Sequence, residues 1–138
     1  MATNKNPIFL NTLVSVNNEI DNAQGTTPDV VFTAGADGGA ITNLIATSTD
    51  TVASIIVLSS DVGAQINVLG EVTVLPGAGT DGVTPSKNLL DSTAMPGILQ
   101  NDGSMAVGAN TSILAGAKAA VSAATVVSIS SVGGLYSV

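Results

Sequence analysis

The sequence predicts an all-β fold: a two-sheet antiparallel β-sandwich (jelly-roll-like or barrel-like) with an extended N-terminal arm and one short helix. Two observations carry this prediction. Short runs of Val, Ile, Leu and Thr alternate with clusters of Gly, Asp, Asn, Pro and Ser along the 138 residues, a spacing typical of sandwiches and barrels. Hydrophobic residues make up 45% of the chain, enough to build a core in one domain. We divide the chain into residues 1–27, an arm or edge strand, and a sandwich domain over residues 28–138.

The N-terminal segment is apolar before the first turn, which we expect at residues 22–27. Six side chains make it so: Ile8, Phe9, Leu10, Leu13, Val14 and Val16. They belong either to an extended arm or to an edge strand. Because an exposed apolar strand pairs readily with another chain, these six residues are the predicted interface. We hypothesise that this segment is exchanged between subunits.

Three strands are expected next, over residues 29–34, 40–47 and 52–59, each followed by turn residues. We predict that they form a three-strand meander. The run 55–58 is apolar at every position, so as a strand it should be buried on both faces. The second sheet would cover one face, and either a long loop or a neighbouring subunit would cover the other.

The middle of the chain continues with a strand over residues 65–75, in which Gly70 indicates a β-bulge. Residues 76–85 are rich in Gly and Pro and are therefore predicted to be a loop. Ser86 follows as the N-cap of the short helix, which ends at Asp91 and turns its leucines inward.

The last third is predicted to contain two hairpins. The first turns at Asn101-Asp102-Gly103, between Ile98–Leu99 and Met105–Val107. The segment 112–124 fits helical spacing and is rich in alanine, but it also alternates and runs into a strongly strand-like stretch. We therefore predict a second hairpin there, turning near Ser122.

The composition excludes several classes of function. The chain has no Arg, His, Cys or Trp, only three Lys, and a formal net charge of -7. Nucleic-acid binding needs a basic surface, which three scattered lysines cannot provide. No segment approaches the roughly 20 continuous apolar residues of a membrane span. We therefore expect no nucleic-acid or membrane partner.

Catalysis and cofactor binding are also not expected. Without His or Cys, the pairs left to consider are Ser86 with Lys87 as nucleophile and base, and Glu19 with Asp21 as glycosidase carboxylates. Helix capping and turn formation explain both pairs better. We predict no catalytic residue, cofactor site or metal site.

Calcium is the one metal that the available ligands could hold, because it prefers carboxylate and carbonyl oxygens. The candidate ligands are loop aspartates: Asp37, Asp50, Asp61, Asp81 and Asp102. They lack the repeated pattern of calcium-binding loops. Turn formation accounts for each of them.

Short glycine-led motifs carry a family resemblance. They are Phe32-Thr33-Ala34-Gly35, Ser48-Thr49-Asp50-Thr51, Asn88-Leu89-Leu90-Asp91, Met95-Pro96-Gly97-Ile98-Leu99, Asn101-Asp102-Gly103, Ser112-Ile113-Leu114-Ala115-Gly116-Ala117, Ala120-Val121-Ser122-Ala123 and Gly133-Gly134-Leu135-Tyr136. Over residues 28–136 the chain thereby resembles small structural proteins of tailed bacteriophages, of the head decoration or cement type.

The resemblance implies a non-enzymatic virion protein, made in the host cytoplasm and located on the outer capsid surface. It implies a homotrimer that bridges subunits of the major capsid protein and so stabilises the head. The chain departs from usual interfaces in lacking Arg and aromatic anchors, so its contacts would depend on aliphatic packing repeated over many copies. The alternatives are a tail, baseplate or fibre module, or a carbohydrate-binding adhesin that uses Tyr136, Phe32 and loop aspartates.

Overall fold

The computed structural model describes residues 9–137, with side chains for residues 12–136. These residues form nine β-strands and no helix. The strands are β1 (Phe9–Asp21), β2 (Asp29–Thr33), β3 (Gly39–Ser48), β4 (Ser54–Val62), β5 (Gln65–Val74), β6 (Lys87–Asn88), β7 (Met105–Val107), β8 (Ser112–Ala117) and β9 (Val126–Ser137). The all-β prediction is confirmed.

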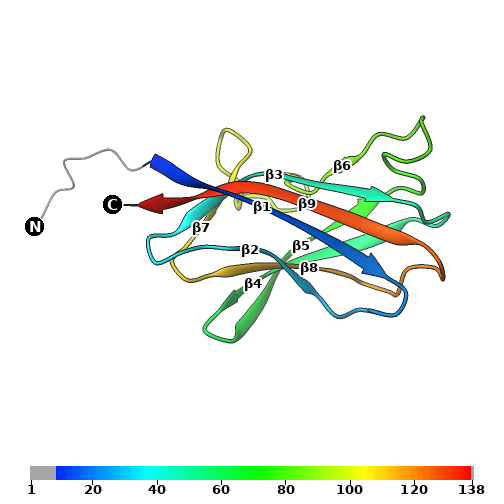
Figure 1. The fold of residues 1–138 in the computed structure, drawn as a ribbon, viewed down its shortest axis with the longest axis horizontal. Coiled ribbons are helices and arrows are strands. Elements are labelled where there is room, and N and C mark those ends of the chain that lie inside the picture. The colour runs from blue at the N-terminus through cyan, green and yellow to red at the C-terminus, as the bar shows by residue number, and fades with distance from the viewer. Residues whose placement is uncertain (1–8, 138) are drawn as a thin grey trace, which may run out of the picture.

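The strands form two antiparallel sheets, which Figure 1 shows as two layers. The first sheet has the order β1-β9-β3-β6, and β7 also pairs with β3. The second sheet has the order β2-β8-β4-β5. Buried apolar side chains of both sheets form one core between them, and the sheets are not closed into a barrel. The architecture is therefore sandwich-like.

Phe32 of β2 is fully buried between the two sheets. Its ring faces two glycines of the first sheet, Gly39 on β3 and Gly133 on β9. A Cβ added to either glycine would lie 3.1 Å from a ring carbon of Phe32. The same Cβ would collide with a carbonyl oxygen of the adjacent strand, that of Gly134 for Gly39 and that of Ala40 for Gly133. Glycine is therefore required at both positions.

The predicted helix at residues 86–91 is wrong. Lys87–Asn88 instead forms the short strand β6 against β3, and the backbone N–H of Leu89 donates to the carbonyl of Leu44 at 2.7 Å. So short a segment gains more from bonds to an existing strand edge than from a costly helix nucleus. Its two leucines do point inward, and with Met95 they join the core.

The predicted meander is also wrong, although its three strands are present. β2 and β4 lie in the second sheet, whereas β3 between them lies in the first. Each connection therefore crosses from one sheet to the other. Alternating apolar residues specify that a strand has a buried face, but they do not specify which sheet provides its neighbours.

The predicted hairpin near Ser122 fails for the same reason. Residues 112–117 do form a strand rather than a helix, but β8 lies in the second sheet and β9 in the first. At the other hairpin a turn does form around Asp102, because the Gln100 N–H donates to the Ser104 carbonyl at 2.8 Å and the Gly103 N–H donates to the Gln100 carbonyl at 2.9 Å. However, β7 pairs with β3 and not with Ile98–Leu99.

The predicted bulge at Gly70 is confirmed. The register of β4 and β5 shifts where Leu58 faces Gly70 and Ser59 faces Val68, which leaves Leu69 as the extra residue. Gly70 faces the core, where a Cβ would lie 2.6 Å from Cγ of Met95. The bulge thus makes room for Met95 and the chain around it, which cover this side of the core.

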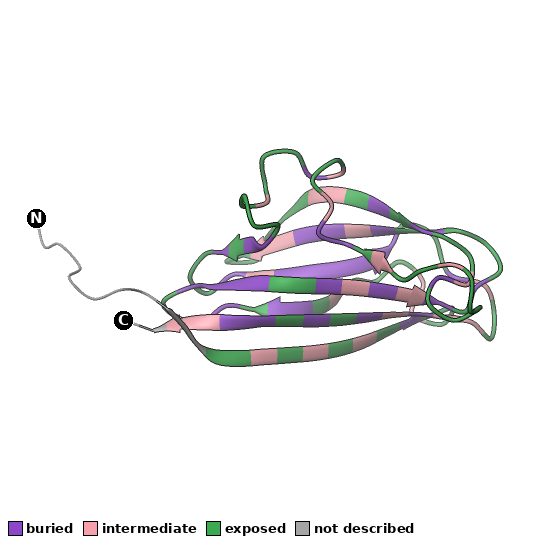
Figure 2. Ribbon diagram, turned by 90° about the horizontal axis from the view of Figure 1, so that it is seen from above, coloured by how far each residue is buried: buried purple, intermediate pink, exposed green. Residues whose placement is uncertain are grey.

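Residues 9–21 lie at the edge of the first sheet as β1, which pairs with β9 from Phe9 to Asp21. In Figure 2, β1 alternates between exposed and half-buried residues. Ile20 is the one residue of residues 12–21 that is fully buried. The division of the chain at residue 27 stays a prediction.

The tight packing around Gly133 predicts that one methyl group added there lowers the stability of the fold strongly. In Gly133→Ala, the new Cβ would collide with the carbonyl oxygen of Ala40 and press on Phe32. We expect a loss of more than about 2 kcal/mol of unfolding free energy, measured by urea denaturation.

Gly108→Ala is the matched control, because its Cβ would meet only Oγ1 of Thr111, at 3.6 Å. We expect a change within about 0.5 kcal/mol for this variant. Equal losses of unfolding free energy in the two variants would contradict the requirement for glycine at residue 133.

Candidate interaction surfaces

The outer face of the second sheet carries apolar side chains across all four strands. Val30 on β2 pairs with Leu114 on β8, and Ser59 on β4 pairs with both Leu114 and Val68 on β5. Directly opposed residues share a face, so these side chains form one row across the sheet. Val30 and Val68, at the two ends of the row, are 46% and 64% exposed, whereas Leu114 and Ser59 between them are buried.

We call this surface the outer apolar face, and it consists of Val30, Ile55, Val57, Ile66, Val68 and Leu114. The run 55–58 contributes two of its residues. Ile56 and Leu58 are fully buried in the core, but Ile55 is 37% exposed and Val57 is half-buried. The described residues thus leave the outer side of this run partly exposed, so the prediction of a covering loop is wrong. Cover by a neighbouring subunit stays a prediction.

The tip of the β4–β5 hairpin projects from the sandwich (Figure 1). Residues 65–68 are exposed at every position, so neither face of this part rests on the other sheet. Gly63 and Ala64 have φ values of 57° and 68°, the left-handed geometry of a two-residue hairpin turn. The tip presents Val62 and Ile66, which are 52% and 53% exposed, beside Val68.

Sequence reasoning predicted these strands but missed their exposure. The alternation of Ile66 and Val68 with polar residues indicates one apolar face, and such a face is normally buried. A signal was nevertheless present, because the bulge at Gly70 separates the exposed half of β5 from its buried half. Val72 and Val74, beyond the bulge, are in the core.

Of the six predicted interface residues, the three with described side chains lie on two different faces of β1, and the interface itself stays a prediction. Ile8 lies outside the described residues, and the side chains of Phe9 and Leu10 are likewise not described. Leu13 is 85% exposed on the outer face of β1. Val14 and Val16 lie on the opposite, inner face, where both are half-buried and Val14 packs against the core.

The two lysines in the described residues are paired within the chain. Lys118 Nζ lies 3.0 Å from Glu71 Oε1, and Lys87 Nζ lies 3.2 Å from Asp91 Oδ2. Both pairs are partly solvent-exposed, so each contributes little stability. The two lysines lie in separate pairs, so the described part of the chain has no cluster of positive charge.

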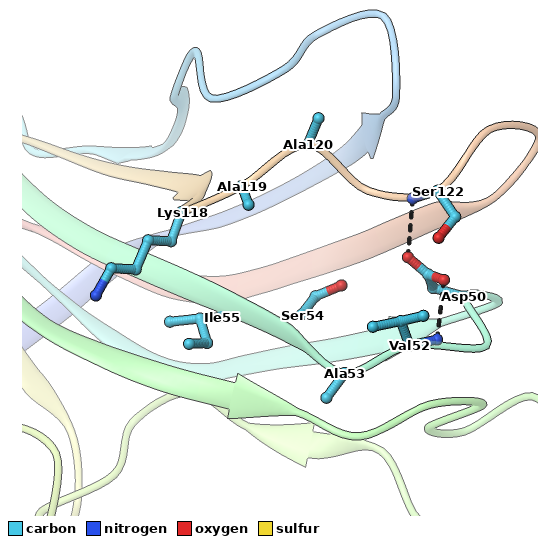
Figure 3. Close-up of a pocket in the computed structure, with 9 residues that line it drawn as sticks. All are labelled: Asp50, Val52, Ala53, Ser54, Ile55, Lys118, Ala119, Ala120 and Ser122. Carbon is cyan, nitrogen blue, oxygen red and sulfur yellow. Dashed lines mark hydrogen bonds between the residues drawn. The ribbon is translucent and has the colours of Figure 1, made fainter.

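A hollow of 380 Å³ lies beside the outer apolar face, between the β3–β4 and β8–β9 connections (Figure 3). Asp50 and Ser122 stand at one end and Lys118 at the other. The Asp50 carboxylate accepts hydrogen bonds from the backbone N–H groups of Val52 and Ser122, both at 3.0 Å. Its acceptors are thus engaged in joining two sheet-crossing connections.

This bonding lowers the pKa of Asp50 below its ordinary value, chiefly through the hydrogen bond from the Ser122 backbone. Desolvation opposes the shift, because Asp50 is 3% exposed, but it does not reverse it. The charged form is therefore the stabilising one. Asp50 has a structural role in the fold.

Other aspartates also bond to turn backbone. Asp81 accepts from the N–H groups of Val83 and Thr84, and Asp102 accepts from that of Ser104. The turn explanation is thus confirmed for Asp50, Asp81 and Asp102. Within residues 9–137 no three acidic, His or Cys residues come together as a potential metal site.

The carbohydrate hypothesis loses one of its residues. Phe32 is fully buried beneath the first sheet, so its ring cannot stack on a sugar. Tyr136 is half-buried at the end of β9.

No protein-family model, curated protein or solved structure matches this chain. Among the described residues there is no helix of the length and hydropathy that a membrane span requires.

The role of Asp50 predicts a specific stability loss. In Asp50→Ala, the partly buried N–H of Ser122 loses its acceptor, so we expect about 1–3 kcal/mol lower unfolding free energy at neutral pH. Urea denaturation measures this loss. Asp37→Ala, on an exposed turn, is the matched control and should change stability little.

The same carboxylate predicts a pH dependence. Because the folded pKa of Asp50 is lowered, its stabilisation is fully present above the unfolded pKa, near 3.8, and is lost as pH falls through the folded pKa. The difference between wild type and Asp50→Asn should therefore shrink below about pH 4. A difference that is unchanged from neutral to acid pH would contradict the assignment.

Proposed function

We propose that this chain is a non-enzymatic structural protein of a virion, which decorates a bacteriophage capsid and stabilises it by bridging major capsid subunits. The observation that carries the proposal is the outer apolar face together with the projecting β4–β5 hairpin. Four of its side chains, Val30, Ile55, Ile66 and Val68, are exposed on one side of the second sheet, and exposed apolar side chains gathered on one face mark protein-protein contact sites. The resemblance in sequence supplies the phage head as the setting.

The proposal includes a homotrimer on the outer capsid surface, assembled from chains made in the host cytoplasm. Each contact would be aliphatic and individually modest, because the exposed residues are Val and Ile rather than Trp, Tyr or Arg. A trimer that engages several capsid subunits at once multiplies these contacts. Repetition would then provide the strength that single hot spots provide elsewhere.

The closest alternative is another virion role, in the tail, baseplate or fibre. An outer apolar face would serve subunit packing there equally well. Copy number separates the roles, because head decoration requires many copies per particle and a fibre or baseplate requires few. A tail tube also has a high copy number, so cryo-EM of labelled particles is needed to distinguish tube from head.

An adhesin is the second alternative, and the burial of Phe32 weakens it. A glycan array without binding would remove it.

The first expected result is that the protein is an abundant component of purified virions and lies on the head. Quantitative mass spectrometry gives its copy number, and cryo-EM gives its position. Absence from purified particles would overturn the proposal.

The second expected result concerns the hairpin. The double variant Ile66→Asp with Val68→Asp places two carboxylates where the outer apolar face would contact the capsid. Burying unpaired charge is costly, so we expect affinity for undecorated heads to fall at least about tenfold in a pull-down titration.

The control is Gln65→Asp with Asn67→Asp, which adds the same charge to polar, exposed positions of the same hairpin. Both double variants should remain folded, because all four side chains are exposed in the monomer. Equal loss of binding in the two variants would indicate a general charge effect and would contradict a role of the apolar side chains.

A further inference from the structure

The free edge of β1 is a long, unprotected strand edge. β1 is the terminal strand of the first sheet, and no strand of residues 9–137 pairs with its other side. From Thr12 to Asn18 it pairs with β9 without a register shift, and this stretch contains no Pro, Gly or charged residue. Bulges, prolines and charges are the usual means by which proteins prevent pairing at an exposed edge. This edge therefore has the properties of a strand that accepts a partner.

We propose that β1 pairs antiparallel with β1 of a second copy, about a two-fold axis at Ser15, so that two first sheets join into one continuous sheet. The occupant of the edge is thus another molecule of the same chain. A two-fold contact is self-complementary, so the strand itself must supply both sides of the match.

The apolar pattern of the strand supplies that match. An axis at Ser15 sets Val14 of one copy opposite Val16 of the other, and both valines lie on the inner face, where they are half-buried in the single molecule. Cross-strand pairs of β-branched residues stabilise a sheet. The axis at Ser15 forms this pair twice, once on each side of the axis. Moving the axis to Val16 would leave a single Val16–Val16 pair and would set Val14 opposite the polar Asn18.

The charges of β1 favour antiparallel pairing. Its two acidic residues, Glu19 and Asp21, are both at its C-terminal end. Antiparallel pairing sends the acidic ends of the two strands in opposite directions, so each lies beside an uncharged part of the other strand. Parallel pairing would set Glu19 against Glu19, and directly opposed like charges destabilise a sheet.

The test uses the full chain and does not rest on the proposed capsid role. Ser15 is exposed on the outer face, so Ser15→Lys and Ser15→Glu should each leave the single molecule folded. At the axis Ser15 faces its own copy, so either variant sets two like charges against each other. Pairing of two β1 edges would join two of the proposed homotrimers into a hexamer, or two single chains into a dimer. Sedimentation analysis should therefore show wild type as an even multiple of the chain mass and each variant at half that mass.

Mixing the two variants supplies the sharpest result. The introduced lysine of one variant then faces the introduced glutamate of the other across the axis, and the wild-type mass should be restored in the mixture but in neither variant alone. Ser130→Lys is the matched control, because Ser130 is exposed on the same outer face but lies on β9, inside the sheet. This control should keep the wild-type mass.

Three results would overturn the proposal: a monomeric or odd-numbered wild type, variants with the wild-type mass, or a mixture that stays at half mass. If the wild type is monomeric and Ser15→Lys still abolishes attachment to heads, the edge binds another protein instead. Loss of capsid attachment in the hairpin variant alone leaves this inference untouched, so the two proposals can fail independently.

Discussion

The ring of Phe32, from the second sheet, lies against the backbone of Gly39 and Gly133 in the first sheet, and the packing of the two sheets depends on this contact. These glycines are on β3 and β9, the two adjacent strands in the middle of the first sheet, so one ring from the second sheet spans both. Aromatic residues make up only 2% of the chain, and the rest of the core is built from Val, Ile, Leu, Ala and Met. Phe32 is the one large ring among these smaller side chains. The missing side chains at Gly39 and Gly133 leave room for it, so the interior can stay closely packed there.

The chain crosses repeatedly from one sheet to the other, so the connecting segments at the ends of the sheets must be held in place. β2, β3 and β4 alternate between sheets, as do β8 and β9, and Asp50 joins two of these connections through the N–H groups of Val52 and Ser122. Asp81 and Asp102 stabilise neighbouring loops in the same manner. The carboxylates of these three residues therefore contribute to the fold through backbone N–H groups. This gives a structural reason for a chain that carries many more acids than bases.

The two proposed binding surfaces lie on different sheets. The outer apolar face belongs to the second sheet and extends onto the β4–β5 hairpin, whereas the open edge belongs to β1 of the first sheet. A molecule with two separate surfaces can contact one kind of partner with each, which is what a repeated assembly requires. Neither surface has aromatic or arginine anchors, so each contact should be weak alone and effective in number.

The sequence by itself determined where the strands lie, because β-branched residues, alternation and turn residues are local signals. Residues 29–33, 39–48, 65–74 and 112–117 are strands as predicted, the bulge falls at Gly70, and Asp50, Asp81 and Asp102 form turns. Only the tertiary structure decided which strands are neighbours, because pairing depends on chain segments far apart in sequence. For that reason the meander and the hairpin near Ser122 were wrong, and residues 87–88 became a strand on the edge of β3 rather than part of a helix. The exposure of Ile66 and Val68 could not be predicted for the same reason. Alternation indicates that a strand has an apolar face, but only the position of the opposite sheet decides whether that face is covered.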